Sequence, residues 1–84
     1  MAKTFHLTIA RVGQNLFDGE AISVTLPGVE GEFTVLAGHE AFVTPLAQGT
    51  ARVVEHNGET LEFTIDLPPG GIAEVSENQA TVLL

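Results

Sequence analysis

Apolar and polar residues alternate in short runs along most of this chain, and glycine, proline or polar turn residues separate the runs. The alternation is clearest in residues 5–9 and 22–26, where apolar side chains occupy every second position. A period of two places those side chains on one face of a β-strand, so His6 is expected to point outward. No segment shows three turns of a helical period with caps. The chain is therefore expected to consist of strands.

Many short strands at regular spacing predict an all-β fold, namely an antiparallel β-sandwich or flattened barrel of two packed sheets, without a helical domain. With 84 residues the chain has room for one domain, residues 1–84, and for one modest core. Cysteine is absent, so packing must stabilise that core without disulfides or thiolate metal sites.

Glycine and proline mark the expected turns. Asp18-Gly19 is interpreted as a turn before the strand at residues 22–26, and Pro27-Gly28 ends that strand. Residues 66–71 contain two prolines and two glycines, which predicts a loop.

The strongest hairpin signal is Asn57-Gly58, which lies between residues 50–55 and 59–65. A two-residue turn would mix polar and apolar side chains on each face. A three-residue loop, residues 56–58, separates the two kinds, so this register is predicted, with Gly58 as a left-handed bulge residue. The pairs on its apolar face are Ala51 with Phe63 and Val53 with Leu61.

The net charge of −8, from 3 basic and 11 acidic residues, argues against several classes of partner. Phosphate backbones and anionic lipid surfaces would repel such a chain, so nucleic acid is not expected to bind. No apolar run approaches the roughly 20 residues that span a bilayer, and the first residues do not resemble a signal peptide. On charge alone, a solvated acidic surface is favoured over a surface for a basic protein.

The ionisable residues form no recognisable catalytic or metal-binding pattern. His6, His39 and His56 lie on different expected elements, whereas a metal site needs convergent ligands. Glu30 and Glu32 are placed on exposed backbone, without the burial that raises the pKa of a catalytic carboxyl group. No glycine-rich segment opens a helix as a phosphate cradle would. No catalytic residue, metal or cofactor is therefore expected.

The centre of the chain is the most distinctive region. Two apolar runs, residues 33–36 and 42–46, are separated by Gly38-His39-Glu40 and closed by Gly49. This pattern predicts a buried strand that enters a sharp loop and leaves as a second strand. Because a rigid scaffold presents its binding residues on such loops, this one is the expected functional surface.

The order of motifs resembles the amino-terminal β-sandwich domain of the epsilon subunit of rotary, F-type ATP synthases. The resemblance covers nearly the whole chain and rests on Phe5-His6-Leu7, Leu16-Phe17-Asp18-Gly19, the run from Gly31-Glu32 through Gly38-His39, Thr44, Gly49, Arg52, Gly70-Gly71-Ile72-Ala73-Glu74-Val75 and Ala80-Thr81-Val82-Leu83. It implies two antiparallel sheets packed face to face, located in the central stalk between the gamma subunit and the ring of c subunits.

The resemblance also implies a function. It implies a non-catalytic rotor subunit without a cofactor, which couples ion-driven rotation of the c ring to gamma and the catalytic head. The implied location is the cytoplasmic side of an energy-transducing membrane, in contact with it only through the complex. Glu30, Gly31 and Glu32 resemble the loop that faces the polar loops of the c ring. The part that resembles the gamma-facing region consists of Gly38, His39, Glu40, Ala41, Phe42, Val43 and Thr44.

The chain departs from the family pattern at three places. Glu40-Ala41 follows the Gly-His pair where the family often has Ala-Pro. The segment before the double glycine, residues 66–69, is longer and richer in proline than the corresponding segment of the family. The sequence stops at Leu84, either as a natural end or before the pair of inhibitory helices that many members carry. Whether protons or sodium ions would drive the complex stays open. Two alternatives also stay open, namely an unrelated small all-β interaction module and a small metal hydrolase that uses His39, Glu40 and His56.

Overall fold

The computed structural model describes residues 3–38, 40–65 and 71–84, and the regular elements in these residues are β-strands. They are β1 (Phe5–Arg11), β2 (Gln14–Gly28), β3 (Gly31–Leu36), β4 (Phe42–Pro45), β5 (Gly49–Glu55), β6 (Thr60–Ile65), β7 (Ile72–Ser76) and β8 (Gln79–Leu83). The prediction of an all-β fold is confirmed. Over these residues there is no helix long and apolar enough to cross a membrane. His39 and most of the loop predicted at residues 66–71 lie outside the described residues.

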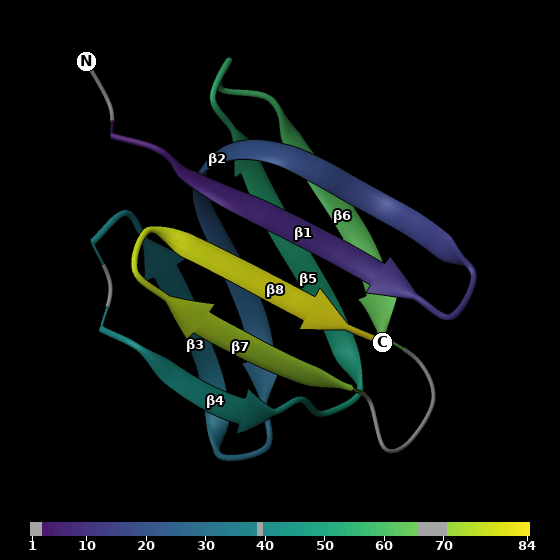
Figure 1. Cartoon of the computed structure of the whole chain (residues 1–84). Helices are drawn as coiled ribbons and strands as arrows, with labels where there is room; N and C mark the ends of the chain where they lie inside the picture. The colour runs from purple at the N-terminus through teal and green to yellow at the C-terminus, as the bar shows by residue number, and fades with distance from the viewer. Residues whose placement is uncertain (1–2, 39, 66–70) are drawn as a thin grey trace.

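The long strand β2 connects two layers of the fold (Figure 1). Its first half pairs with β1, and its second half lies between β3 and β5. One layer runs from β1 through β8 and β7 to β4, and the other contains β3, the second half of β2, β5 and β6. Where β2 crosses from one layer to the other, its pairing with β5 shifts in register between Ala21 and Ser23. The predicted sandwich is thus one eight-stranded sheet folded onto itself.

One strand pair differs from the antiparallel arrangement that the sequence predicts. β1 and β8 run parallel, with partners from His6↔Gln79 to Ala10↔Leu83. A hairpin turn forces its two strands to be antiparallel, but β1 and β8 lie near opposite ends of the chain, so no such turn constrains them. The Leu84 amide continues the pairing by donating to the Ala10 carbonyl oxygen at 2.8 Å.

The core lies between the two layers and consists of apolar side chains. The period of two is confirmed in β1, where Phe5, Leu7 and Ile9 are buried and His6 is exposed. The buried residues are Phe5, Leu7, Ile9, Ala21, Val24, Leu26, Val35, Leu46, Ala51, Val53, Ile65, Ala73, Val75, Ala80 and Val82. No buried polar or charged residue occurs among the described residues. The fold is therefore held by apolar packing, as expected for a chain without cysteine.

The turn expected at Asp18-Gly19 is wrong, because both residues lie inside β2 and face Thr8 and Leu7 of β1. The chain turns earlier, at Val12-Gly13, where Gly13 adopts a φ of 76°. A glycine takes this left-handed conformation without the steric cost of a Cβ atom.

Two other local expectations have different outcomes. The register of the β5–β6 hairpin is confirmed, since Ala51 faces Phe63 and Gly58 has a φ of 89°. The alternation of residues 22–26 is confirmed only in part. The shift at this position buries Ala21 completely and leaves Ile22 partly exposed.

Candidate docking site

A groove opens at the side of the sandwich where β3 and β4 form the edges of the two layers. Its volume is about 440 Å³, and its lining comes from the turn between β2 and β3, the start of β3, and β4. The lining residues are Gly28, Glu30, Gly31, Glu32, Phe33, Phe42, Val43 and Thr44. The groove is open to solvent, so its shape suits a segment of another protein better than an enclosed small molecule.

Two glycines allow the turn between β2 and β3 to close tightly against the groove. Gly31 has a φ of 133°, which side chains with a Cβ atom rarely adopt. A Cβ atom on Gly28 would lie 2.8 Å from the Gly31 carbonyl oxygen and 3.0 Å from the Phe33 ring. Both positions therefore require glycine, and the acidic Glu30 is presented at the tip between them.

Backbone hydrogen bonds fasten this turn to the end of β4. The Val29 amide donates to the Pro45 carbonyl oxygen at 3.3 Å, and the Ala47 amide donates to the Pro27 carbonyl oxygen at 2.7 Å. These bonds connect the two layers at the end of the groove. The turn and β4 are consequently held as one unit.

An aromatic pair connects the two walls of the groove. The rings of Phe33 and Phe42 lie edge to face, with centroids 5.4 Å apart and an interplanar angle of 75°. Both side chains are half-buried and pack against the core. Such a pair stabilises the contact between the two walls by roughly 1 kcal/mol beyond the buried area.

The rim of the groove is negatively charged. Glu30 and Glu32 are exposed, and the lining contains no basic residue. Within the part of the chain that the structure describes, the ion pairs lie elsewhere, between Arg52 and Glu62 and around His6. The carboxylates of the rim are therefore available to basic groups of a partner.

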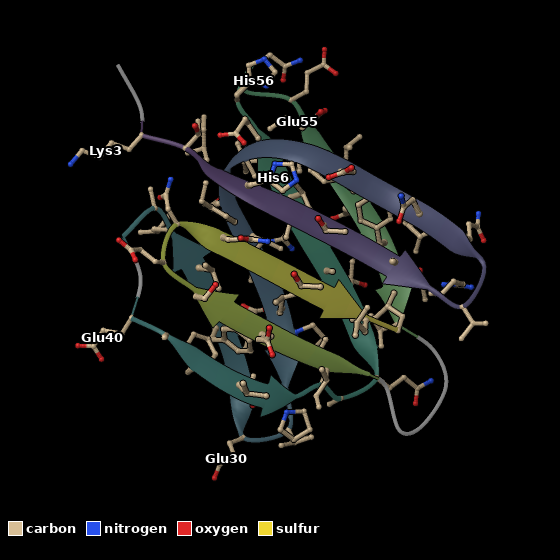
Figure 2. The ribbon with its side chains drawn as sticks, viewed as in Figure 1. Lys3, His6, Glu30, Glu40, Glu55 and His56 are labelled. Atoms are coloured by element: carbon tan, nitrogen blue, oxygen red, sulfur yellow. The ribbon has the colours of Figure 1, made fainter. Side chains whose placement is uncertain are left out.

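The structure brings some of the residues selected from the sequence together and separates others. The segments 30–32 and 42–44 line the same groove, although the family resemblance implied a different partner for each. Glu30 and Glu40 lie at well-separated positions on the outside of the sandwich (Figure 2). Gly38 has a φ of 79° and starts the loop toward Glu40, while Ala41 is exposed. His39 lies outside the described residues.

The hydrolase alternative receives no geometric support from these positions. Glu40 and His56 lie in different parts of the molecule (Figure 2). Among the residues that have described positions, no three histidine, aspartate or glutamate side chains could hold a metal ion together.

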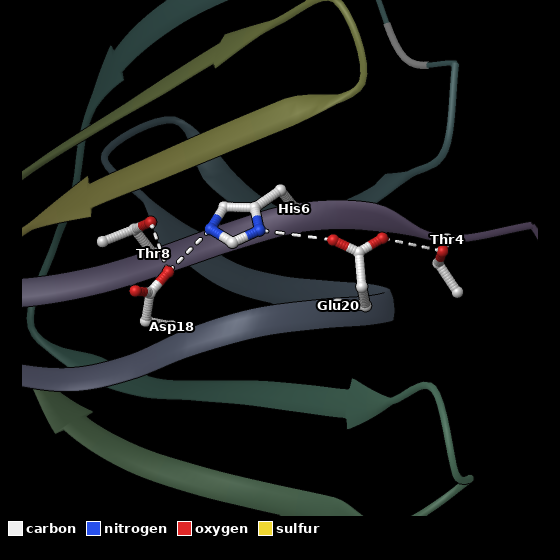
Figure 3. A network of polar contacts seen from close by, with 5 residues as sticks. All are labelled: Thr4, His6, Thr8, Asp18 and Glu20. Atoms are coloured by element: carbon white, nitrogen blue, oxygen red, sulfur yellow. Dashed lines mark hydrogen bonds and ion pairs between the residues drawn. The ribbon is translucent and has the colours of Figure 1, made fainter.

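A polar cluster around His6 was missed in the sequence (Figure 3). His6 Nε2 lies 2.6 Å from Asp18 Oδ1, and His6 Nδ1 lies 3.2 Å from Glu20 Oε2. Both ring nitrogens can donate to these carboxylates at the same time only when the imidazole is protonated. The hydrogen bonds to Asp18 and then Glu20 raise the pKa of His6 above 6.5. The pairing of β1 with β2 places Asp18 and Glu20 beside His6. The turn expected at Asp18-Gly19 excluded this pairing, so the cluster was not predicted.

The fold is a small all-β sandwich, and an open groove lies between β3 and β4 at its side. The family described as ATP synthase, Delta/Epsilon chain, beta-sandwich domain matches residues 4–84 of this chain. The ATP synthase epsilon chain of Bradyrhizobium sp. (strain ORS 278) is 42% identical over 80 residues, and that of Afipia carboxidovorans is 44% identical over 80 residues. The chain therefore belongs to the family of ATP synthase delta/epsilon-chain β-sandwich domains.

Each of these two alignments covers 95% of this chain but 56% of the relative, so the chain spans a little more than half the length of the relatives it matches. Solved structures agree with the assignment. A chain in the Euglena gracilis mitochondrial ATP synthase (OSCP/F1/c-ring) superposes with a TM-score of 0.86 at 29% identity, covering 95% of this chain and 49% of that one. A chain of the Tetrahymena thermophila central stalk/c-ring structure superposes at 0.74 with 12% identity, covering 96% and 63%, which supports the fold alone.

Proposed function

We propose that this chain is the docking domain of a non-catalytic rotor subunit, which couples ion-driven rotation of a c ring to the gamma subunit of an ATP synthase. Residues 1–84 act as a single domain. It works at the cytoplasmic side of the membrane as a peripheral part of the complex and needs no metal or cofactor. The family membership supports the type of complex. The geometry of the groove supports the choice of the residues that would contact the two partners.

The observation that carries the proposal is that one groove joins the two segments proposed for the two partners. Glu30, Gly31 and Glu32 would contact the polar loops of the c ring. Phe42, Val43 and Thr44, together with Gly38, His39, Glu40 and Ala41, would contact gamma. Because backbone hydrogen bonds tie the β2–β3 turn to β4, a force applied at one segment is passed to the other without a flexible link.

The chemistry of the groove suits such a joint. The exposed carboxylates of Glu30 and Glu32 can pair with basic side chains of a partner loop across a wet interface. Rim charges of this kind add little affinity individually, but they set the orientation and the rate of association. Phe33 and Phe42 supply an apolar surface beneath them.

Capture of the partner subunits from the same source tests the proposal. The intact chain is expected to bind gamma and the assembled c ring, whereas Glu30→Lys combined with Glu32→Lys should abolish binding to the c ring. The matched control carries Glu55→Lys and Glu59→Lys at the tip of the other hairpin, which changes the net charge equally and should leave binding intact.

Two results would contradict the proposal. Failure of the intact chain to capture either partner would favour an unrelated interaction module. Equal loss in the two charge-reversal variants would show that net charge matters and that the groove does not.

A further inference from the structure

The tip of the β5–β6 hairpin combines an asparagine with a glycine in a part of the molecule that the proposed function does not use. His56, Asn57 and Gly58 are exposed there, and the tip projects beyond the rest of the two strands (Figures 1 and 2). Asparagine is among the thermolabile residues of proteins. The backbone nitrogen of the next residue can attack its side-chain amide, because this attack closes a five-membered ring. Gly58 follows Asn57 and has no Cβ atom to obstruct the approach.

The structure holds the Asn57 side chain toward the Gly58 backbone. The Glu59 amide donates to Asn57 Oδ1 at 2.9 Å, so the side chain folds back over residue 58 instead of extending into solvent. The same donor is aimed at the oxygen on which negative charge develops when a nucleophile adds to the amide carbon, and it stabilises that charge. One hydrogen bond therefore both orients the amide and favours attack on it.

The attacking nitrogen needs only a small opening of the turn. The Gly58 amide donates to the Glu55 carbonyl oxygen at 2.8 Å, and this bond must break before the nitrogen can react. Residues 56–59 are all exposed, so no buried side chain has to leave the core. Exposed turns open locally at a much lower free energy than the whole domain. A Cβ atom on Gly58 would meet nothing within 4 Å, so the ring has room to form.

Three other positions with related chemistry each lack one of these features. Asn15 is followed by a leucine and Asn78 by a glutamine, and their side chains obstruct the neighbouring nitrogen. An aspartate can close the same ring with a following glycine, as in Asp18-Gly19, but these two residues lie inside β2 and are paired with β1. Among these positions, the tip of the β5–β6 hairpin is where the reactive pair and its exposure coincide.

We propose that Asn57 is a site of spontaneous deamidation in the folded chain. The Gly58 nitrogen forms a bond to the side-chain carbonyl carbon of Asn57, and the bond from that carbon to the side-chain nitrogen breaks. Ammonia leaves with the proton of the Gly58 amide. Water then opens the cyclic imide at one of its two carbonyl carbons. Opening at the main-chain carbonyl leaves isoaspartate, and opening at the side-chain carbonyl leaves aspartate.

The two products change the hairpin differently. Each adds a negative charge between Glu55 and Glu59 to a chain whose net charge is already −8. Isoaspartate also routes the main chain through the former side chain, which adds one carbon atom to the loop. Because the register of a hairpin depends on its loop, isoaspartate should loosen the pairing of β5 with β6, whereas aspartate should keep it. The groove at β3 and β4 is lined by other residues.

Storage of the purified chain in warm, mildly alkaline buffer tests the proposal. Mass spectrometry of proteolytic fragments is expected to find the side-chain NH2 of Asn57 replaced by OH, while Asn15 and Asn78 stay intact. Enzymatic methylation of isoaspartyl carboxyl groups distinguishes isoaspartate from aspartate. The same chain stored in urea shows how fast the reaction proceeds without the turn. Intact Asn57 in the folded chain would overturn the proposal, and conversion in urea alone would show that the fold protects this residue.

Two glycine variants test the route of the reaction. Gly58→Ala should slow the conversion about tenfold, because the added Cβ atom crowds the attacking nitrogen. The matched control is Gly13→Ala in the β1–β2 turn, where the glycine also has a positive φ and open space around it, and its rate should equal that of the intact chain. Circular dichroism checks that both variants stay folded. Equal rates in Gly58→Ala and the intact chain would overturn the attack by the Gly58 nitrogen.

The variant Asn57→Asp separates the effect of charge from the effect of the longer main chain. The isoaspartate form, isolated by ion exchange, should unfold at a lower denaturant concentration than Asn57→Asp. Equal midpoints would overturn the loosening of the hairpin. These measurements involve no partner subunit, so their outcome is independent of the proposed function.

Discussion

The hairpins β2–β3 and β5–β6 have the same plan, yet their edges differ in chemistry. Each hairpin ends in a six-residue strand, and among the described residues this strand pairs with one neighbouring strand. On β6, Glu62 lies opposite Arg52 and pairs with it at 3.4 Å. On β3, Glu32 lies opposite Pro27, which offers no charge. The charge on one edge is thus compensated within its own hairpin, whereas the charge on the other edge is not.

The two turns also differ in how closely the rest of the molecule packs against them. The β5–β6 turn is open, and a Cβ atom on Gly58 would meet nothing within 4 Å. The β2–β3 turn is crowded against the Phe33 ring and bonded to the end of β4. A turn that only connects two strands needs a permissive backbone, but a turn that presents a groove must also be packed from behind.

The largest expected effect comes from filling the two glycine positions. Gly28→Ala should lower the free energy of unfolding by about 2 kcal/mol, because the new methyl group overlaps the Gly31 carbonyl and the Phe33 ring. Gly58→Ala should cost about 1 kcal/mol, from the left-handed backbone alone. Chemical denaturation of both variants measures the difference. Equal losses would mean that the β2–β3 turn is no more tightly packed than the other turn.

Replacing one phenylalanine by leucine in each hairpin should change the free energy of unfolding less. Phe33→Leu removes the edge-to-face contact with Phe42, so it should cost about 1 kcal/mol more than Phe63→Leu, which breaks no such pair among the described residues. Thermal and denaturant unfolding of the two variants test this difference. A cost for Phe63→Leu that matches or exceeds the other would remove the special role of the aromatic pair.

The Arg52–Glu62 pair should contribute still less to stability. Both side chains are about half exposed, so Arg52→Ala is expected to cost about 0.5 kcal/mol or less, and the effect should shrink at high salt. The variant also leaves Glu62 uncompensated, which makes the β6 edge resemble the β3 edge in charge. A loss of several kcal/mol in Arg52→Ala would contradict this expectation. It would show that the ion pair on β6 stabilises the fold, so that the two edges could not be compared by charge alone.

The sequence predicted the features that depend on neighbouring residues. The alternation in β1 and the register of the β5–β6 hairpin followed from local patterning and turn chemistry, and both are confirmed. The parallel β1–β8 pair was not predictable in this way, because nothing local relates Leu7 to Ala80. The turn assigned to Asp18-Gly19 was wrong because Gly13 satisfies the same chemistry earlier in the chain.

The candidate site was also predicted only in part. Residues 30–32 and 42–44 were selected through the family resemblance, but their meeting in one groove depends on the two layers and on the contact between Phe33 and Phe42. The free edge of β3 likewise follows from the order of strands in the sheet. The sequence of a strand does not show whether one or both of its edges are paired.

The smallest expected effect concerns His6, whose positive charge compensates Asp18 and Glu20 as Arg52 compensates Glu62. The other strand beside β1 places the uncharged Gln79 next to His6. Because the two carboxylates raise the pKa of His6 in the folded chain, its contribution to stability is present below pH 6.5 and is lost as the pH rises through the raised pKa. An NMR titration of the His6 ring should give a pKa above 6.5, and Asp18→Asn should lower it.

Above that pKa, Asp18 and Glu20 should become as uncompensated as Glu30 and Glu32, so the unfolding free energy should fall slightly with pH in the intact chain. The fall should be smaller in His6→Gln, which keeps hydrogen-bonding atoms but cannot change charge. A His6 pKa at or below 6.5, or an identical pH dependence in the two chains, would show that His6 does not compensate these carboxylates. Glu30 and Glu32 would then no longer be distinguished from other acidic residues by their lack of a basic neighbour.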